Sequence, residues 1–165
     1  MRYKVAPPAR GVDSLAETQR AVPLVPETVD DCCARLVERT AVDTREDARE
    51  WLAFLEALEL VEETPRGYRR LQVDPERERL GDAFRERVFG AVELLSALGS
   101  EPLTVDEAFE RLREHVPRWE RDRRADWERD WRERTERLLD WGVALGLATR
   151  EGGRYRLDDG EKAAG

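Results

Sequence analysis

The chain of 165 residues is long enough for one ordinary domain or two small ones, and its 37 acidic and 29 basic residues give a net charge of −8. A single histidine, His115, and two adjacent cysteines, Cys32 and Cys33, argue against a His-rich metal site, most general-base catalysis and a secreted disulfide framework. No apolar run approaches the roughly 20 residues that span a bilayer, and the N-terminus lacks the apolar core of a signal peptide. We therefore expect a cytoplasmic protein that is not an enzyme and that needs no cofactor, metal or membrane.

The first half of the chain predicts helices with marked beginnings. A short helix is expected over residues 14–22, where Pro23 stops it, and a second one begins after Thr28. The capping-box pattern, a hydroxyl three residues before an acid, satisfies free backbone N–H groups at a helix start. It occurs at Ser14 with Glu17, Thr28 with Asp31, Thr44 with Asp47, and Thr104 with Glu107.

A third helix and a hairpin complete this half. The helix is expected over residues 45–60, because its apolar side chains follow the i, i+3, i+4, i+7 spacing of one buried face. These side chains are Ala48, Trp51, Leu52, Leu55 and Leu58. Residues 60–71 then form two short apolar-alternating runs around Pro65 and Gly67, which is typical of a hairpin.

The second half of the chain predicts the same order of elements. A long helix is expected over residues 81–98, and a second helix follows the cap at Thr104. A third helix is expected to begin near Ala125 and to exceed its counterpart in the first half by about two turns. A hairpin over residues 147–157 follows, with Gly152 and Gly153 in a two-residue turn that needs positive φ.

The two halves also repeat in sequence. One set of residues recurs at a constant offset of 76, from Pro26, Thr28, Val29, Asp30, Asp31 and Leu36 to Pro102, Thr104, Val105, Asp106, Glu107 and Leu112. A second set recurs at an offset of 87, from Arg45, Glu46, Leu52, Ala57, Leu58, Leu60, Tyr68 and Arg69 to Arg132, Glu133, Leu139, Ala144, Leu145, Leu147, Tyr155 and Arg156. Duplication of one unit, with an 11-residue insertion near residues 116–130 of the second copy, explains both offsets.

In this order of elements the sequence resembles the winged helix-turn-helix superfamily in tandem, of the kind common in halophilic archaea. The resemblance rests on the repeat and on residues 28–71, and the excess of carboxylates over lysines fits a salt-loving cytoplasm. It implies a mainly α fold with two small β wings. We expect an N-terminal tail (1–13), a first winged-helix unit (14–72), a linker (73–80), a second winged-helix unit with the insertion (81–158) and a disordered C-terminal tail (159–165).

The resemblance implies that the third helix lies in the DNA major groove and that the wing contacts the backbone. The third helix of the first unit has two arginines against five carboxylates, and that of the second unit has four against six, so the Arg-bearing wings are the better phosphate contacts. Net acidity does not exclude double-stranded DNA as partner, because counterion release contributes little in molar salt. The candidate DNA contacts are Arg45, Arg49, Arg66, Arg69, Arg70, Arg132, Arg150, Arg154 and Arg156. The alternative is that the wing arginines only balance nearby glutamates.

The insertion combines tryptophan and arginine in a way that suits a contact with a protein partner or a second copy of the chain. The candidate partner-binding residues are Trp119, Arg121, Arg123, Arg124 and Trp127. The alternative is that Trp127 and Trp131 pack on the helix over residues 81–98 as core. The leading function is therefore a DNA-binding module of transcription-regulator type. Its rival is a protein-interaction scaffold of acidic tandem winged helices that does not bind DNA.

The remaining reactive side chains predict no chemistry. Cys32 and Cys33 point about 100° apart on a helix and correspond to Ala108 and Phe109 in the second unit, so core packing is favoured over redox sensing. His115 has no second ligand at metal-binding spacing. No phosphate loop, serine elbow or metal motif is present in the sequence.

Overall fold

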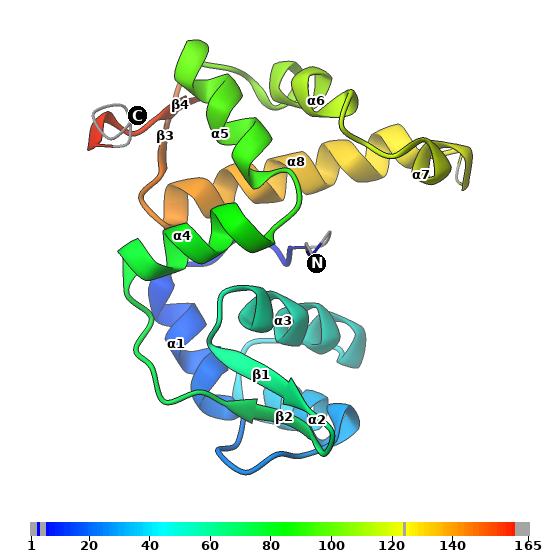
Figure 1. The fold of residues 1–165 in the computed structure, drawn as a ribbon, viewed down its shortest axis with the longest axis vertical. Coiled ribbons are helices and arrows are strands. Elements are labelled where there is room, and N and C mark those ends of the chain that lie inside the picture. The colour runs from blue at the N-terminus through cyan, green and yellow to red at the C-terminus, as the bar shows by residue number, and fades with distance from the viewer. Residues whose placement is uncertain (1–2, 4–5, 124, 161–165) are drawn as a thin grey trace. The chain divides into compact units, whose positions relative to one another are not determined.

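The computed structural model describes residues 3, 6–123 and 125–160, and the chain divides into two compact units, Met1–Val88 and Phe89–Gly165 (Figure 1). Each unit is mainly helical and carries one two-stranded antiparallel sheet, as the sequence predicts. The expected linker over residues 73–80 contains the first residues of a helix of the first unit. The tail expected at residues 159–165 lies outside the described residues from residue 161 onward.

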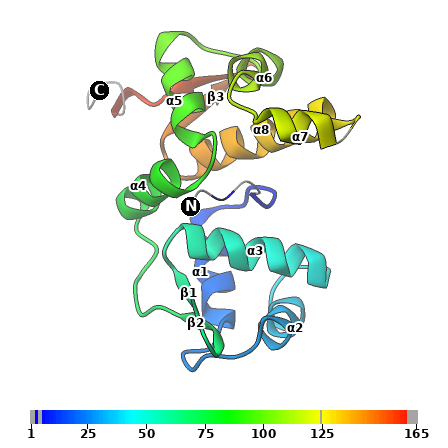
Figure 2. The ribbon, with the colours of Figure 1, turned by 45° about the vertical axis from the view of Figure 1, so that its right-hand side comes forward.

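The first unit has its helices and its hairpin in the expected order. Its elements are α1 (Val12–Ala21), α2 (Val29–Arg39), α3 (Arg45–Ala57), β1 (Val61–Thr64), β2 (Gly67–Arg70) and α4 (Arg77–Arg87). α2 packs on α3, and the β1–β2 hairpin lies against both helices (Figure 2). The core between them is built from the apolar stripe of α3, where Ala48, Leu55 and Leu58 have no exposed surface.

The second unit repeats this arrangement with a longer third helix. Its elements are α5 (Ala91–Ser100), α6 (Val105–Arg113), α7 (Arg118–Arg123), α8 (Trp127–Ala144), β3 (Ala148–Glu151) and β4 (Arg154–Leu157). α6 packs on α8, β3 packs on α8, and β4 packs on α5. The apolar side chains Phe109, Leu112 and Leu138 are buried between these elements.

Threonine side chains cap the starts of three helices, α2, α3 and α6. The hydroxyls of Thr28 and Thr44 each accept a hydrogen bond from the backbone N–H three residues later, at 3.1 Å. Thr104 forms the complete capping box with Glu107, whose carboxylate accepts from the Thr104 N–H at 2.9 Å. The expected cap at Ser14 is wrong: α1 begins at Val12 after Gly11, so Ser14 lies inside the first turn.

The hairpins of the two units match residue for residue. Tyr68 of β2 exchanges two backbone hydrogen bonds with Glu27, at 2.9 and 3.1 Å, and Tyr155 of β4 exchanges two with Leu103, at 2.7 and 2.9 Å. The two tyrosines therefore lie at equivalent positions on the second strand of each hairpin, as the offset of 87 predicts. The second turn has Gly152 and Gly153 at φ 56° and 78°, which confirms the predicted positive-φ turn.

The long helix expected over residues 81–98 is wrong, because the structure has two helices there. α4 ends at Arg87, Val88 is extended and bridges to Tyr3, and α5 begins after Gly90. Gly90 has a φ of 90°, a backbone conformation that residues other than glycine rarely adopt. A Cβ at this position would also lie 3.2 Å from a methyl of Leu112, so the break depends on the absence of a side chain.

The third helix of the second unit is longer than its counterpart, as predicted, but by less than expected. α8 has 18 residues against 13 in α3 and begins at Trp127, two residues after Ala125. The remainder of the insertion forms α7, a separate helix of 6 residues that packs on α8 (Figure 2).

Candidate nucleic-acid interface

The candidate interface of the first unit comprises the start of α3 and the wing. Arg45 occupies the first position of α3 and is exposed, and no carboxylate of the described chain forms an ion pair with it. Arg49, one turn later, lies 3.7 Å from a carboxylate oxygen of Asp30 on α2. Both side chains are on the surface of the helix that winged-helix units place in the major groove.

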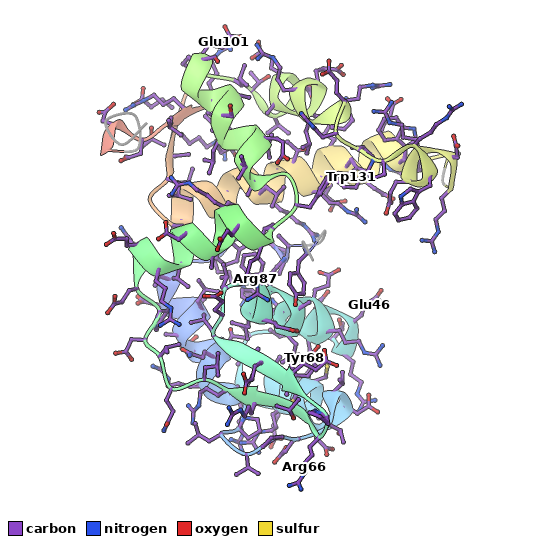
Figure 3. All side chains as sticks on the ribbon, viewed as in Figure 1. Glu46, Arg66, Tyr68, Arg87, Glu101 and Trp131 are labelled. Atoms are coloured by element: carbon purple, nitrogen blue, oxygen red, sulfur yellow. The ribbon has the colours of Figure 1, made fainter. Side chains whose placement is uncertain are left out.

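The wing of the first unit presents one arginine at its tip. Arg66 lies in the two-residue loop between Thr64 and Gly67, and Figure 3 shows its side chain pointing away from the hairpin. It is exposed and pairs with no carboxylate among the residues described. Arg69 forms an ion pair with Glu62 across the hairpin. Arg70 is half-buried and donates to the backbone oxygen of Arg20 at 3.4 Å.

Gly67 holds this wing close to the chain before α2. Its φ of 124° is rare for residues other than glycine. A Cβ added to Gly67 would lie 1.9 Å from the backbone oxygen of Glu27. The close approach allows the two hydrogen bonds between Tyr68 and Glu27. The position of Arg66 at the wing tip therefore depends on a glycine beside it.

In the second unit the candidate arginines already have partners. Arg132 lies 2.9 Å from Asp106 on α6, and Arg154 lies 2.7 Å from Glu107 at the α6 cap. The hydrogen bonds from Thr104 hold the pKa of Glu107 below its usual value, and Arg154 lowers this pKa further.

The two remaining candidates of the second wing are also engaged. Arg156 bridges Glu151 at 3.2 Å and Asp159 at 3.1 Å. The guanidinium of Arg150 lies 5.3 Å from the centre of the Tyr155 ring, a cation–π distance. The tip of this wing is Gly152 and Gly153, which carry no charge.

These pairs weigh against the second wing as the main phosphate contact. An exposed ion pair contributes about 0 to 1 kcal/mol, so a phosphate can compete with the carboxylate at small cost. The expectation that wing arginines balance nearby carboxylates describes Arg69, Arg154 and Arg156. It does not describe Arg66 of the first unit.

The tryptophans of the insertion differ in burial. Trp131 is 2% exposed and packs edge-on against Phe89 at a centroid distance of 5.5 Å. Phe89 lies just before α5, and Trp131 lies on α8, where Figure 3 labels it. Trp127 packs on Phe109 of α6, not on the segment over residues 81–98 that the alternative named.

Two arginines lie at cation–π distance from Trp127. The guanidinium carbons of Arg113 and Arg121 both lie 5.0 Å from the centre of its ring. Of the other candidate partner-binding residues, Arg123 and Trp119 are exposed, Trp119 by 54%. Arg124 lies outside the described residues. Of the candidate residues, Arg121 and Trp127 are therefore stacked together, whereas Trp119 and Arg123 remain exposed.

The two cysteines are core residues. Cys32 and Cys33 are 0% and 1% exposed, and the Cys32 thiol faces the backbone oxygens of Glu27 and Tyr68 at 3.6 and 3.8 Å. Burial raises the pKa of Cys32 to about 11, so the thiol stays protonated near neutral pH. In the part of the chain that the structure describes, no three His, Cys, Asp or Glu side chains gather as metal ligands.

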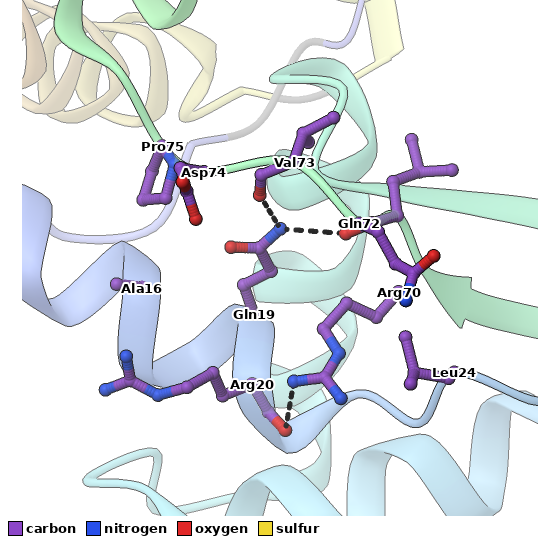
Figure 4. A pocket seen from close by; sticks show the side chains of 10 residues that line it. Ala16, Gln19, Arg20, Leu24, Arg70, Gln72, Val73, Asp74 and Pro75 are labelled. Carbon is purple, nitrogen blue, oxygen red and sulfur yellow. Dashed lines mark hydrogen bonds between the residues drawn. The ribbon is translucent and has the colours of Figure 1, made fainter.

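The structure also has a cavity in the first unit that the sequence analysis missed. It has a volume of about 390 Å³ and lies between the end of α1 and the segment after β2 (Figure 4). Its lining residues are Ala16, Gln19, Arg20, Leu24, Arg70, Leu71, Gln72, Val73, Asp74 and Pro75. A signal was available: Gln19 is a long polar side chain on the face of α1 that also carries the buried Leu15.

No helix within the described ranges combines the length and the apolar composition needed to cross a bilayer. No curated protein and no solved structure matches the chain. A family model does match it, over residues 1–162, and its description names two winged helices, the architecture that both units show. The chain therefore belongs to the family of the halobacterial double winged helix domain.

Proposed function

We propose that this protein is a DNA-binding regulator whose first winged-helix unit makes the main contact with duplex DNA. The observation that carries this proposal is the pairing of the surface arginines. Arg45 and Arg66 are exposed and have no carboxylate partner among the described residues, whereas Arg132, Arg154 and Arg156 are ion-paired and Arg150 lies against the Tyr155 ring.

The positions of these two arginines support the same assignment. Winged-helix units contact DNA with the start of the third helix and with the wing, and these are the places of Arg45 and Arg66. An arginine that has no internal partner can bind a phosphate without first breaking an ion pair. The second unit has glycines at the corresponding wing tip, so its part in phosphate binding is smaller.

The proposal predicts saturable binding of the folded protein to duplex DNA. The experiment is a fluorescence-anisotropy titration of a labelled duplex over a series of KCl concentrations at which circular dichroism shows the protein folded. We expect an affinity that falls linearly with the logarithm of the salt concentration, because bound phosphates release counterions. Absence of binding at every such concentration would contradict the proposal.

A second candidate function is a protein-interaction scaffold that does not bind DNA. The observation that favours it is the charge of α3, which carries two arginines against four carboxylates within its bounds. Acidic third helices repel phosphate and suit a basic protein partner. A chain that fails to bind DNA in the titration but remains folded would shift the assignment to this scaffold.

A further inference from the structure

The cavity beside α1 combines apolar walls with a half-buried arginine, Arg70, whose Nε atom has no hydrogen-bond partner in the described part of the chain. The Nε atom of Arg70 is enclosed and has no hydrogen-bond acceptor, and its Nη1 has only the backbone oxygen of Arg20 at 3.4 Å, a long contact. No carboxylate of the described chain forms an ion pair with Arg70. Enclosed polar atoms in proteins nearly always have a partner, so the Nε of Arg70 is a donor that the described residues leave without an acceptor.

The other residues that line the cavity indicate the chemistry of a ligand that could supply this acceptor. Half of the lining side chains are apolar: Ala16, Leu24, Leu71, Val73 and Pro75. The charged ones are Arg20, Arg70 and Asp74, so the net charge of the lining is positive. A volume of about 390 Å³ lies within the range of small-molecule sites.

The walls of the cavity are fixed by Gln19. Its side-chain nitrogen donates to the backbone oxygens of Leu71 at 3.2 Å and Val73 at 2.9 Å, and lies 3.4 Å from that of Leu60 (Figure 4). One buried amide therefore holds the segment after β2 in place along α1. A cavity held by hydrogen bonds across more than 50 positions of sequence is part of the fold, not a gap between loose loops.

The second unit shows that the fold does not need an arginine here. β1 pairs Val61 with Arg70, and β3 pairs Ala148 with Leu157 at the same register. Leu157 lies against α5: a Cβ added to Gly99 of that helix would lie 3.8 Å from a methyl carbon of Leu157. An apolar side chain therefore occupies in the second unit the place that Arg70 has in the first.

We infer that this cavity binds a small organic anion with a compact apolar body, whose carboxylate pairs with Arg70. The apolar body contacts Ala16, Leu71 and Val73, and the carboxylate replaces the long contact to the Arg20 backbone with a charge-assisted hydrogen bond. Arg20, Leu24 and Asp74 are exposed, so the cavity opens to solvent and the ligand can enter without unfolding. The inference does not depend on the proposed DNA binding.

The test uses the full chain and a set of probes without DNA. Benzoate is titrated into ¹⁵N-labelled protein and the signals of Gln19, Arg70 and Val73 are followed by NMR, with benzamide, acetate and benzylamine as comparisons. We expect saturable shifts with benzoate. Benzamide, which lacks the charge, and acetate, which lacks the apolar body, should bind about tenfold more weakly or not at all. Tighter binding of benzylamine than of benzoate would overturn the inference.

Variants separate the site from general electrostatics. Arg70→Gln should weaken benzoate binding at least about tenfold, whereas Arg39→Gln, which removes an exposed arginine at the end of α2, should leave it unchanged. Asp74→Asn should strengthen it a few fold, because a like charge leaves the cavity. Ala16→Leu keeps every charge and the helix propensity of α1 but fills the cavity, so it should abolish binding.

Two outcomes contradict the inference directly. One is the absence of saturable shifts at the cavity with any of the probes. The other is benzoate binding that Arg70→Gln and Ala16→Leu both leave unchanged, which would place the ligand elsewhere. Loss of DNA binding in the anisotropy titration would leave these NMR results as they are, so the failure of one proposal is distinguishable from the failure of the other.

Discussion

Glu59 and Gly146 occupy the same place in the two units, each one residue after the C-cap of the third helix and each with a positive φ, 62° and 78°. In both units the next residue closes the helix end, with Leu60 donating to the Leu55 oxygen at 2.9 Å and Leu147 donating to the Gly142 oxygen at 2.8 Å. This is the Schellman arrangement, which favours glycine. The first unit keeps a glutamate in the strained position, where it lies 3.5 Å from Arg87.

This relationship predicts opposite effects of two substitutions. Glu59→Gly should raise the free energy of unfolding by about 0.5 to 1 kcal/mol, because relief of the left-handed strain exceeds the loss of an exposed ion pair. Gly146→Ala should lower it by about 1 kcal/mol, since a Cβ there meets nothing within 4 Å and only the backbone is strained. Denaturant unfolding in high salt measures both. Glu59→Ala is the control, because it removes the ion pair and keeps the backbone strain. If the Glu59→Gly protein is no more stable than the Glu59→Ala protein, the account is contradicted.

The two wings should differ in their need for glycine. Gly67→Ala should destabilise the first unit by more than about 3 kcal/mol, because the new Cβ collides with the Glu27 backbone 1.9 Å away. Gly153→Ala, at φ 78° with open space around it, should cost about 1 kcal/mol. Thermal unfolding followed by circular dichroism compares the two. Equal costs would show that the close approach of Gly67 to Glu27 is not rigid.

The tryptophans of the insertion should separate into core and surface. Trp131→Ala should lower the free energy of unfolding by about 3 to 5 kcal/mol, because the side chain is 2% exposed and packs on Phe89. Trp119→Ala should change it by about 0.5 kcal/mol or less, since that ring is 54% exposed. If Trp119→Ala instead changes the mass measured by light scattering, the exposed ring takes part in self-association.

The buried thiols predict the alkaline limb of the stability curve. Burial raises the pKa of Cys32 from 9.0 to about 11, and it is also the largest cause of the raised pKa of Cys33. The folded protein therefore holds these protons more tightly than the unfolded chain does. Their contribution to stability is complete below the ordinary thiol pKa and is lost as the pH rises from about 9 to about 11.

Iodoacetamide labelling tests the same point without a stability measurement. The native protein should react far more slowly than the denatured chain at mildly alkaline pH, because the thiolate is the nucleophile and both thiols are enclosed. Cys32→Ala and Cys33→Ala proteins assign any residual reaction to one thiol. Native labelling at the rate of the denatured chain would contradict this description of the two cysteines.

The sequence predicts features of this fold that depend on neighbouring residues. The caps at Thr28, Thr44 and Thr104 depend on a residue three positions away, and the Gly152 and Gly153 turn depends on its own φ preference. The break at Gly90 was missed because apolar residues continue at helical spacing on both sides of it. Gly90 itself was the available signal.

The surface and the cavity depend on contacts that no local pattern contains. Arg154 meets Glu107 across 47 positions, and Gln19 meets Leu71 across 52. The two wings have similar charges along the sequence, whereas the structure pairs Arg154 and Arg156 of the second wing with carboxylates and leaves Arg66 exposed at the tip of the first. The repeat predicts equivalent backbones but not equivalent partners.

The central claim is that the first unit supplies the unpaired arginines that hold DNA, and matched double variants test it most directly. Arg45→Gln with Arg66→Gln, and Arg132→Gln with Arg154→Gln, remove the same charge from the first and the second unit. In the anisotropy titration over a KCl series, the first double variant should weaken duplex binding and reduce the salt slope by up to about two phosphate equivalents. The second should bind nearly as the parent protein does. Equal loss in both variants, or loss only in the second, would contradict the account.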